Sequence, residues 1–136
     1  MINFDGSNGA DPHGSFVLSG STLYGMTAGS SAMTGNIFKI DTNGTGFTVL
    51  HNFYHLASNL ATSEGFRPWG SLTLVGTVLY GMNSMGGENL DGTIFKINTN
   101  GTGFSRIKSF VWTMEIKSPY STLTYLGGYL YGVSRY

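Results

Sequence analysis

The stretch Gly92-Thr-Ile-Phe-Lys-Ile-Asn-Thr-Asn-Gly-Thr-Gly-Phe104 decides the fold, because it joins two apolar runs through an Asn-Gly turn. Such a turn between β-branched and aromatic residues is the strongest short-range signal of a β-hairpin. The pattern predicts a strand at about 93–98, a type I′ turn at Asn100-Gly101 and a strand at about 104–110. We expect two further strands just before it, at about 71–75 and 78–83, so that four strands make one unit.

The same pattern occurs 57 residues earlier, as Gly35-Asn-Ile-Phe-Lys-Ile-Asp-Thr-Asn-Gly-Thr-Gly-Phe47. The tripeptide Leu-Tyr-Gly occurs three times, at 23–25, 79–81 and 130–132. The 21 glycines interrupt any window in which a helix of ordinary length would fit. Repeated four-stranded units of roughly 50 residues are typical of β-propellers. The sequence therefore predicts an all-β protein built from propeller-type, four-stranded blades.

The repeats divide one expected domain, 1–136, into a partial repeat at 1–14, complete repeats at 15–70 and 71–118, and a partial repeat at 119–136. We expect complete blades at about 15–53 and 71–110. We also expect a lone outer strand at about 1–4 and a hairpin at about 121–134. A propeller typically closes with about 4–8 blades, so these strands need further copies of the chain or stack in an open array.

Charge and cysteine content exclude several classes of protein. Lysine and arginine number 7, and aspartate and glutamate also number 7, whereas nucleic-acid binding needs a basic surface. The absence of cysteine excludes disulfides, zinc-thiolate sites and cysteine catalysis. We expect no membrane-spanning segment and no signal peptide within this chain.

Four motifs together make the chain similar to the Gloeo/Verruco tandem repeat: Leu-Tyr-Gly, Gly-x-Ile-Phe-Lys-Ile, Asn-Gly-Thr-Gly-Phe and Phe4-Asp-Gly-Ser-Asn-Gly-Ala-Asp-Pro12. The resemblance implies long bacterial arrays, usually exported, with propeller-like β structure and no catalytic residues. It therefore implies an extracellular or cell-surface location. The chain departs from the family pattern by its shortness and by longer, irregular loops at 54–67 and 111–118.

Side chains that carry chemistry are scattered along the chain. No nucleophile with a base and no phosphate-binding glycine pattern occurs, so we predict no enzyme activity. The weak candidate for a cofactor is calcium at Asp5, Asn8 and Asp11, whose side chains offer the oxygen ligands that calcium takes. The competing interpretation is that these residues serve the geometry of a turn.

Candidate residues for assembly or ligand binding lie at the two termini and in the loops that differ between repeats, where function concentrates. They are Ile2, Phe4, Tyr54, Arg67, Trp69, Trp112, Tyr129 and Tyr131. Aromatic residues and arginine are enriched in interfaces between subunits, and aromatic platforms also hold glycans. Contact with another subunit, packing within the chain and glycan binding all stay open.

We predict a non-enzymatic structural protein that assembles head-to-tail with copies of itself, because unpaired strand edges recruit other chains. Net charge near zero removes long-range repulsion between copies. A filament is favoured over a closed dimer or trimer, since the composite blade formed between two copies would lack one strand. The alternative is a carbohydrate-binding or adhesive module that uses Trp69, Trp112 and nearby tyrosines.

Overall fold

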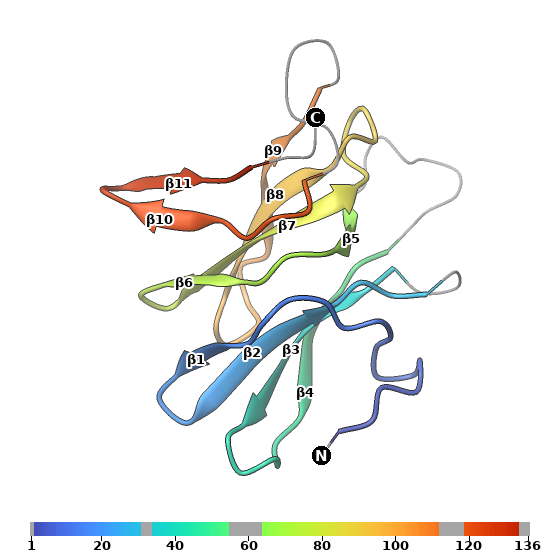
Figure 1. Ribbon diagram of the computed structural model, residues 1–136, viewed down its shortest axis with the longest axis vertical. Coiled ribbons are helices and arrows are strands. Elements are labelled where there is room, and N and C mark those ends of the chain that lie inside the picture. The colour runs from blue at the N-terminus through green and yellow to red at the C-terminus, as the bar shows by residue number, and fades with distance from the viewer. Residues whose placement is uncertain (1, 31–33, 55–63, 112–118, 134–136) are drawn as a thin grey trace.

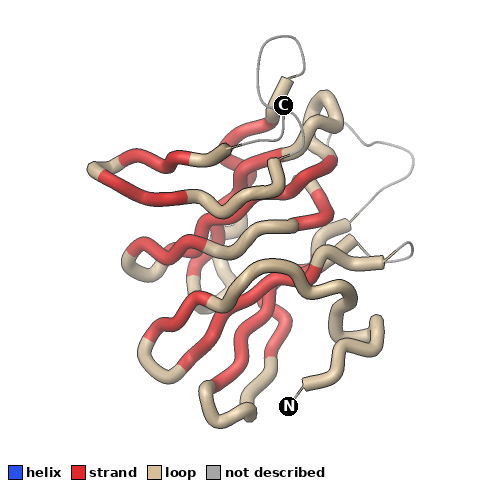
Figure 2. The backbone as a smooth tube through the Cα atoms, in the orientation of Figure 1, coloured by secondary structure: helices blue, strands red, loops and turns tan. Residues whose placement is uncertain are grey.

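The computed structural model describes residues 2–30, 34–54, 64–111 and 119–133. Within these ranges the protein consists of strands and turns without a helix (Figure 2), so the predicted all-β class is confirmed. This part of the chain accordingly has no helix with the length and hydropathy needed to cross a membrane. The strands are β1 (Val17–Ser19), β2 (Thr22–Thr27), β3 (Asn36–Asp41), β4 (Thr48–Asn52), β5 (Phe66–Pro68), β6 (Thr73–Val75), β7 (Val78–Met85), β8 (Thr93–Asn98), β9 (Ser105–Ser109), β10 (Thr124–Leu126) and β11 (Tyr129–Tyr131).

The first unit is the sheet β1-β2-β3-β4, in which each strand pairs with the next along the chain. Gly25 of β2 lies opposite Phe38 of β3 in an antiparallel register. Between β3 and β4 the register shifts at Ile37 and Phe38, which leaves Leu50 as the extra residue of a β-bulge. Its four strands lie within the range of about 15–53 predicted for the first four-stranded unit.

The second unit repeats this arrangement with β6, β7, β8 and β9, close to the four predicted strands. Gly81 lies opposite Phe95, and the bulge recurs with Ile107 as the extra residue. The additional strand β5 lies in the part of the chain predicted to be an irregular loop. It pairs with the end of β7, with Phe66 opposite Met85.

The C-terminal hairpin of β10 and β11 lies within the predicted range of about 121–134. Its turn residues Gly127 and Gly128 have φ angles of 59° and 88°. Positive φ at both central residues is what a type I′ turn requires. Two four-stranded units and one hairpin therefore follow one another along the described chain.

The Asn-Gly turns are not of type I′, so that prediction is wrong. In the second unit φ is positive at Gly101 and Gly103 but not at Asn100. The Asn100 side chain instead accepts a hydrogen bond from the Thr102 backbone N at 3.0 Å, which closes an Asx turn. The connection from β8 to β9 is consequently longer than a two-residue hairpin turn.

The predicted outer strand at about 1–4 is also wrong, because residues 2–4 form no strand. Phe4 instead packs its ring on Phe38 and Phe47, with centroid separations of 5.2 and 6.3 Å. A strand needs a neighbour that takes up its backbone hydrogen bonds. The described part of the chain pairs no strand with residues 2–4.

The three sheets follow one another along the long axis of the molecule, which is vertical in Figure 1, and form an open stack. None of them closes into a barrel. The core lies between the first two units and buries one face of the sheet in each of these two units. Its buried residues are Tyr24, Met26, Ile37, Phe53, Phe66, Leu72, Leu79, Phe95 and Ile97, and Val17, Leu50, Leu74 and Phe104 pack against them.

Candidate functional site

Residues at equivalent positions of the repeat line up in columns along the stack. Ser15, Ser71 and Thr122 each stand three residues after a proline. The Ser15 backbone N donates a hydrogen bond to Ser71 Oγ at 2.7 Å, and the Ser71 N donates to Thr122 Oγ1 at 2.9 Å. The same contact therefore ties the first unit to the second and the second to the hairpin.

The backbones of neighbouring units approach closely at the residue before each of these positions. A Cβ atom on Gly14 would lie 2.6 Å from the carbonyl oxygen of Gly70, and one on Gly70 would lie 2.1 Å from that of Ser121. Such separations are possible because glycine has no Cβ atom. The repeat thus sets a short spacing between sheets at the edge where β1, β6 and β10 begin.

A column of aromatic rings stands next to this edge. Trp69 stacks on His13 with ring centroids 3.9 Å apart, and Tyr120 packs edge-on against Trp69 at 5.5 Å. Each ring belongs to the residue that follows a proline of the repeat, so each unit contributes one ring. The structure thus places Trp69, a predicted ligand or subunit platform, in packing within the chain.

Arg67 is held mainly through its backbone. Its φ angle is 57°, its N donates to the Thr34 carbonyl at 3.0 Å, and its own carbonyl accepts from Ser84 Oγ at 2.8 Å. Asp11, the equivalent residue of the first unit, has a φ of 56°. The left-handed backbone is therefore a property of this repeat position, and the exposed guanidinium approaches the Met85 sulfur at 4.0 Å.

Of the candidate loop residues, Tyr54 is exposed, whereas Trp112 lies outside the described residues.

A contact that the sequence did not predict lies between the units. The ring of His51 stacks on Phe104 with a centroid separation of 3.9 Å, and its Nε2 lies 2.9 Å from Glu64 Oε1. No local signal marks this contact, because the two rings belong to different repeats.

The candidate calcium loop is closed by its own hydrogen bonds. Asp5 Oδ1 accepts from the Ser7 hydroxyl at 2.7 Å and from the Ser7 backbone N at 2.9 Å. These bonds, the hydroxyl first, lower the pKa of the Asp5 carboxyl. Asn8 Oδ1 accepts from the Asp5 N at 3.2 Å, and Asp11 Oδ2 lies 3.1 Å from His13 Nε2. Calcium binding here stays a prediction, and the described residues include no group of three or more His, Asp or Glu side chains placed for a metal ion.

One end of the stack exposes apolar side chains whose equivalents in the other units are buried. Phe16, Leu72 and Leu123 occupy equivalent positions, yet Phe16 is 56% exposed and the two leucines are each 3% exposed. The difference arises because no described unit covers the first sheet on this side. A hollow of about 280 Å³ lies here. We call this surface the leading face and define it by Ile2, Phe4, Phe16, Leu23, Phe38 and Ile40.

The opposite end of the stack, which we call the trailing face, is the outer side of the C-terminal hairpin. It comprises the exposed side chains of Leu126, Tyr129 and Tyr131, together with Val133. Alternation along an extended chain places residues 129, 131 and 133 on the same side. Tyr131 corresponds to Tyr24 of the first unit, which is buried in the core. The terminal candidates predicted from the sequence thus lie on two opposite faces.

This geometry defines an all-β tandem-repeat protein, whose units meet through the same contacts from one unit to the next. The chain belongs to the Gloeobacter/Verrucomicrobia repeat family, whose pattern matches residues 1–136. This match confirms the resemblance carried by the motifs. No curated protein is significantly similar to the chain.

Proposed function

We propose that this protein is a non-enzymatic structural repeat protein of the extracellular space or cell surface, and that it assembles head-to-tail with copies of itself. The leading face of one copy packs on the trailing face of the next, so that the units act as blades of a propeller-type array. The observation that carries the proposal is the 56% exposure of Phe16 against 3% for its covered equivalents. The extracellular setting rests on the resemblance to exported arrays.

The interface between the first two units is the template for the contact between copies. There Tyr24 of one unit and Leu72 of the next belong to one buried cluster. In a head-to-tail pair, Tyr131 takes the position of Tyr24, and Phe16 of the next copy takes that of Leu72. Burial of these large apolar and aromatic side chains favours association.

The columns along the stack continue across the same contact. The Thr122 backbone N of one copy meets Ser15 Oγ of the next, as the Ser71 N meets Thr122 Oγ1 within the chain. Tyr120 likewise faces His13 of the next copy, in the way that Trp69 packs against its two ring neighbours. The contact is heterologous, so it makes a filament when the rotation between copies does not close and a ring when it does.

The structural role also agrees with the environment of the described histidine and glutamate pair. Phe104 covers the His51 ring, and Glu64 approaches its Nε2 at 2.9 Å. A general base must reach the proton of a substrate. We assign this pair to packing between the units, where His51 of the first unit stacks on Phe104 of the second.

Mixing two end-face variants tests the proposal. Phe16→Asp puts a carboxylate on the leading face and Tyr131→Asp puts one on the trailing face, where burial of an unpaired charge opposes contact. Each variant alone should be monomeric in size-exclusion chromatography with light scattering. Because each keeps one intact face, their equimolar mixture should form a 1:1 heterodimer and nothing longer. The wild-type chain should form larger assemblies, and electron microscopy distinguishes filaments from rings.

Tyr54→Asp is the matched control, because Tyr54 is exposed and belongs to neither end face. This variant should assemble as the wild type does. Removal of residues 1–4 or 121–136 should abolish assembly and leave the β-sheet circular dichroism largely intact. A monomeric wild-type chain, or a mixture that yields no heterodimer, would overturn the proposal.

A second candidate function, carbohydrate binding or adhesion, rests on the exposed tyrosines of the hairpin. Tyr125, Tyr129 and Tyr131 present their rings to solvent, and a tyrosine combines an apolar body with a polar edge. Specific hits on a glycan array by a chain that remains monomeric would favour this function over self-assembly.

A further inference from the structure

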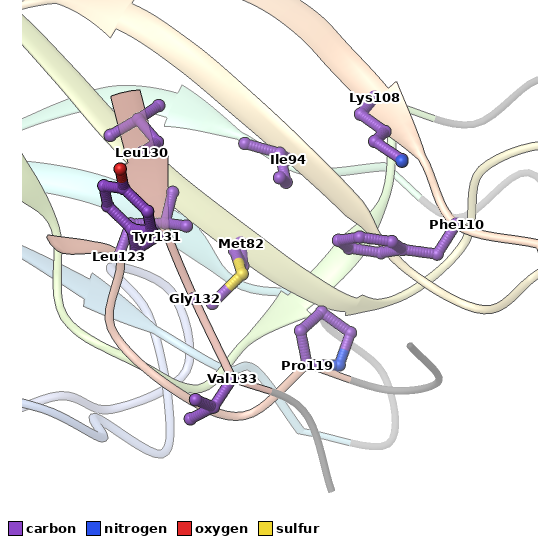
Figure 3. Close-up of a pocket in the computed structure, with 10 residues that line it drawn as sticks. All are labelled: Met82, Ile94, Lys108, Phe110, Pro119, Leu123, Leu130, Tyr131, Gly132 and Val133. Carbon is purple, nitrogen blue, oxygen red and sulfur yellow. The ribbon is translucent and has the colours of Figure 1, made fainter. Parts of the chain in front are cut away.

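A hollow of about 330 Å³ lies between the second unit and the C-terminal hairpin (Figure 3). Met82, Ile94 and Phe110 line it from the second unit, and Leu130 and Gly132 line it from the hairpin. In Figure 3 the Phe110 ring extends into the hollow toward Met82. The lining is mainly apolar, and it also includes Lys108 and Tyr131.

This hollow has the same place in the repeat as the core between the first two units. Its residues Met82, Ile94, Phe110, Leu123 and Leu130 correspond to the core residues Met26, Ile37, Phe53, Leu72 and Leu79. The core also contains Phe95 and Ile97 of β8, and Phe104 just before β9 packs against it. Among the described residues, none takes their place at the hollow.

The three equivalent glycines show which side chain is missing. A Cβ atom on Gly25 would lie 2.7 Å from the ring of Phe38, and one on Gly81 would lie 2.4 Å from the ring of Phe95. At Gly132 the three nearest atoms among the described residues are Leu123 Cδ2 at 3.0 Å and the Cε and Sδ atoms of Met82 at 3.5 Å, and none of them belongs to a ring. Gly132 is therefore a glycine of the same type whose phenylalanine partner is absent from the described chain.

The strand that contains the backbone next to Gly132, β11, is paired on one edge only among the described strands. In the complete units, the Leu-Tyr-Gly strand pairs on both edges, β2 with β1 and β3, and β7 with β6 and β8. Strand β11 pairs with β10 alone among the described strands. Its second edge thus offers backbone donors and acceptors next to an apolar hollow.

We propose that the outer edge of β11 and this hollow form an acceptor site for one extended strand of the pattern Gly-Xaa-Ile-Phe-Lys-Ile, supplied by another repeat unit. The strand adds antiparallel to β11 and seats its phenylalanine over Gly132, in the register in which Phe95 lies opposite Gly81. Its lysine then lies opposite Tyr131 and its second isoleucine opposite Leu130.

When a strand adds to the edge of a sheet, backbone groups and side chains contribute differently to binding. Backbone hydrogen bonds along β11 contribute affinity, and the pockets for alternate side chains contribute specificity. Here the phenylalanine and the second isoleucine enter the apolar side, as Phe95 and Ile97 do in the core. The site goes beyond head-to-tail assembly, because contact between the two end faces leaves the edge of β11 unpaired.

A synthetic peptide tests the site directly. The probe has the sequence of residues 91–99, Asp-Gly-Thr-Ile-Phe-Lys-Ile-Asn-Thr, with blocked ends, and is titrated against the 136-residue chain. We expect 1:1 binding that shifts the backbone amide signals of residues 129–132 in NMR spectra. The peptide with Phe95→Ala should bind about ten- to a hundredfold more weakly, since it loses the burial of one phenylalanine side chain.

Two protein variants separate this site from the end faces. Gly132→Leu fills the seat of the phenylalanine and should abolish peptide binding. Leu126→Asp changes the trailing face on β10, a strand that does not pair with the added strand, so it should weaken self-assembly and leave peptide binding intact. Failure of assembly with retained peptide binding would reject the proposed function and keep the acceptor site.

The acceptor site is rejected if the wild-type peptide does not bind, or if the Phe95→Ala peptide binds equally well. It is also rejected if the amide shifts centre on β7 in place of β11, because the peptide would then exchange with β8 of the second unit. The comparison of the two peptides uses the unaltered protein, so it holds even where Gly132→Leu fails to fold.

Discussion

Asn83 of β7 and Thr93 of β8 form a buried side-chain hydrogen bond across the two strands, and the first unit has a hydrogen-bonded Thr–Asn pair at the equivalent positions, with the residue types exchanged and the hydroxyl as donor. Asn83 Nδ2 donates to Thr93 Oγ1 at 3.3 Å. At the equivalent positions Thr27 Oγ1 donates to Asn36 Oδ1 at 3.0 Å. All four side chains are buried. The exchange indicates that the repeat requires the hydrogen-bonded pair at this place and not one particular residue on one particular strand.

A double exchange tests this pairing. Asn83→Thr alone should lower the free energy of unfolding by about 1–3 kcal/mol, because it removes the hydrogen bonds that Asn83 Nδ2 donates to Thr93 Oγ1 and to the Glu64 carbonyl. Asn83→Thr together with Thr93→Asn recreates the order of the first unit and should recover most of that loss. Chemical denaturation of the wild type, both single variants and the double variant measures the coupling.

The control for this cycle combines Asn83→Thr with Asn36→Thr. These positions lie in different units and bond to separate carbonyl groups, those of Glu64 and Asn8, so the two losses should add. A double exchange that is as unstable as the sum of its two single changes would contradict the pairing.

Ser7 controls the titration of Asp5 in the N-terminal loop. The Ser7 hydroxyl and backbone N lower the pKa of the Asp5 carboxyl from its ordinary value of 3.8. A lowered folded-state pKa means that these bonds stabilise the loop above pH 3.8, and that the contribution is lost as the pH falls through the lowered pKa. Ser7→Ala should return the Asp5 pKa toward 3.8, as measured by NMR of its carboxyl carbon. Ser7→Thr keeps a hydroxyl and should leave the pKa low, and equal titration in both variants would exclude the role of the hydroxyl.

The strands of the two complete units could be predicted from the sequence because their signals are local. The segment from Val78 to Asn98, for example, contains its own apolar alternation and glycine turns. The repeat also shows that Phe16 and Leu72 are equivalent, but the exposure of Phe16 and the burial of Leu72 appear only in the structure. The predicted terminal candidates Ile2 and Tyr131 do lie on the two end faces.

The contacts between units could not be predicted in the same way, because they depend on how the sheets stack. The stacking of His13 on Trp69 and of His51 on Phe104 joins residues from different repeats. Strand β5 forms because the end of β7 extends past β6 and offers it an edge. The residues next to Phe66 in the sequence therefore give no signal that predicts this strand.

The contrast between Gly81 and Gly132 gives a prediction about stability. Gly81→Ala puts a Cβ atom 2.4 Å from the Phe95 ring, so the ring or the strand must shift. We expect a loss of about 1–3 kcal/mol, which is typical of overpacking in a core. At Gly132→Ala the nearest atom is the end of the Leu123 side chain, 3.0 Å away, and the loss should be clearly smaller. Thermal unfolding of the two variants compares them, and equal losses would show that the two glycines have equally filled surroundings.

Phe53 and Phe110 occupy equivalent positions, one inside the complete core and one beside the hollow. Phe53→Ala removes a ring that contacts Phe95 at a centroid separation of 5.2 Å, and should cost about 3–5 kcal/mol. Phe110→Ala should cost less, because its ring has fewer neighbouring atoms to lose on the side of the hollow. Urea denaturation measures both losses.

When the 91–99 peptide is present in excess, the peptide should stabilise the wild type but not the Phe110→Ala variant, since bound ligand stabilises the folded state. Equal losses for the two variants without peptide would mean that the hollow is already filled in solution.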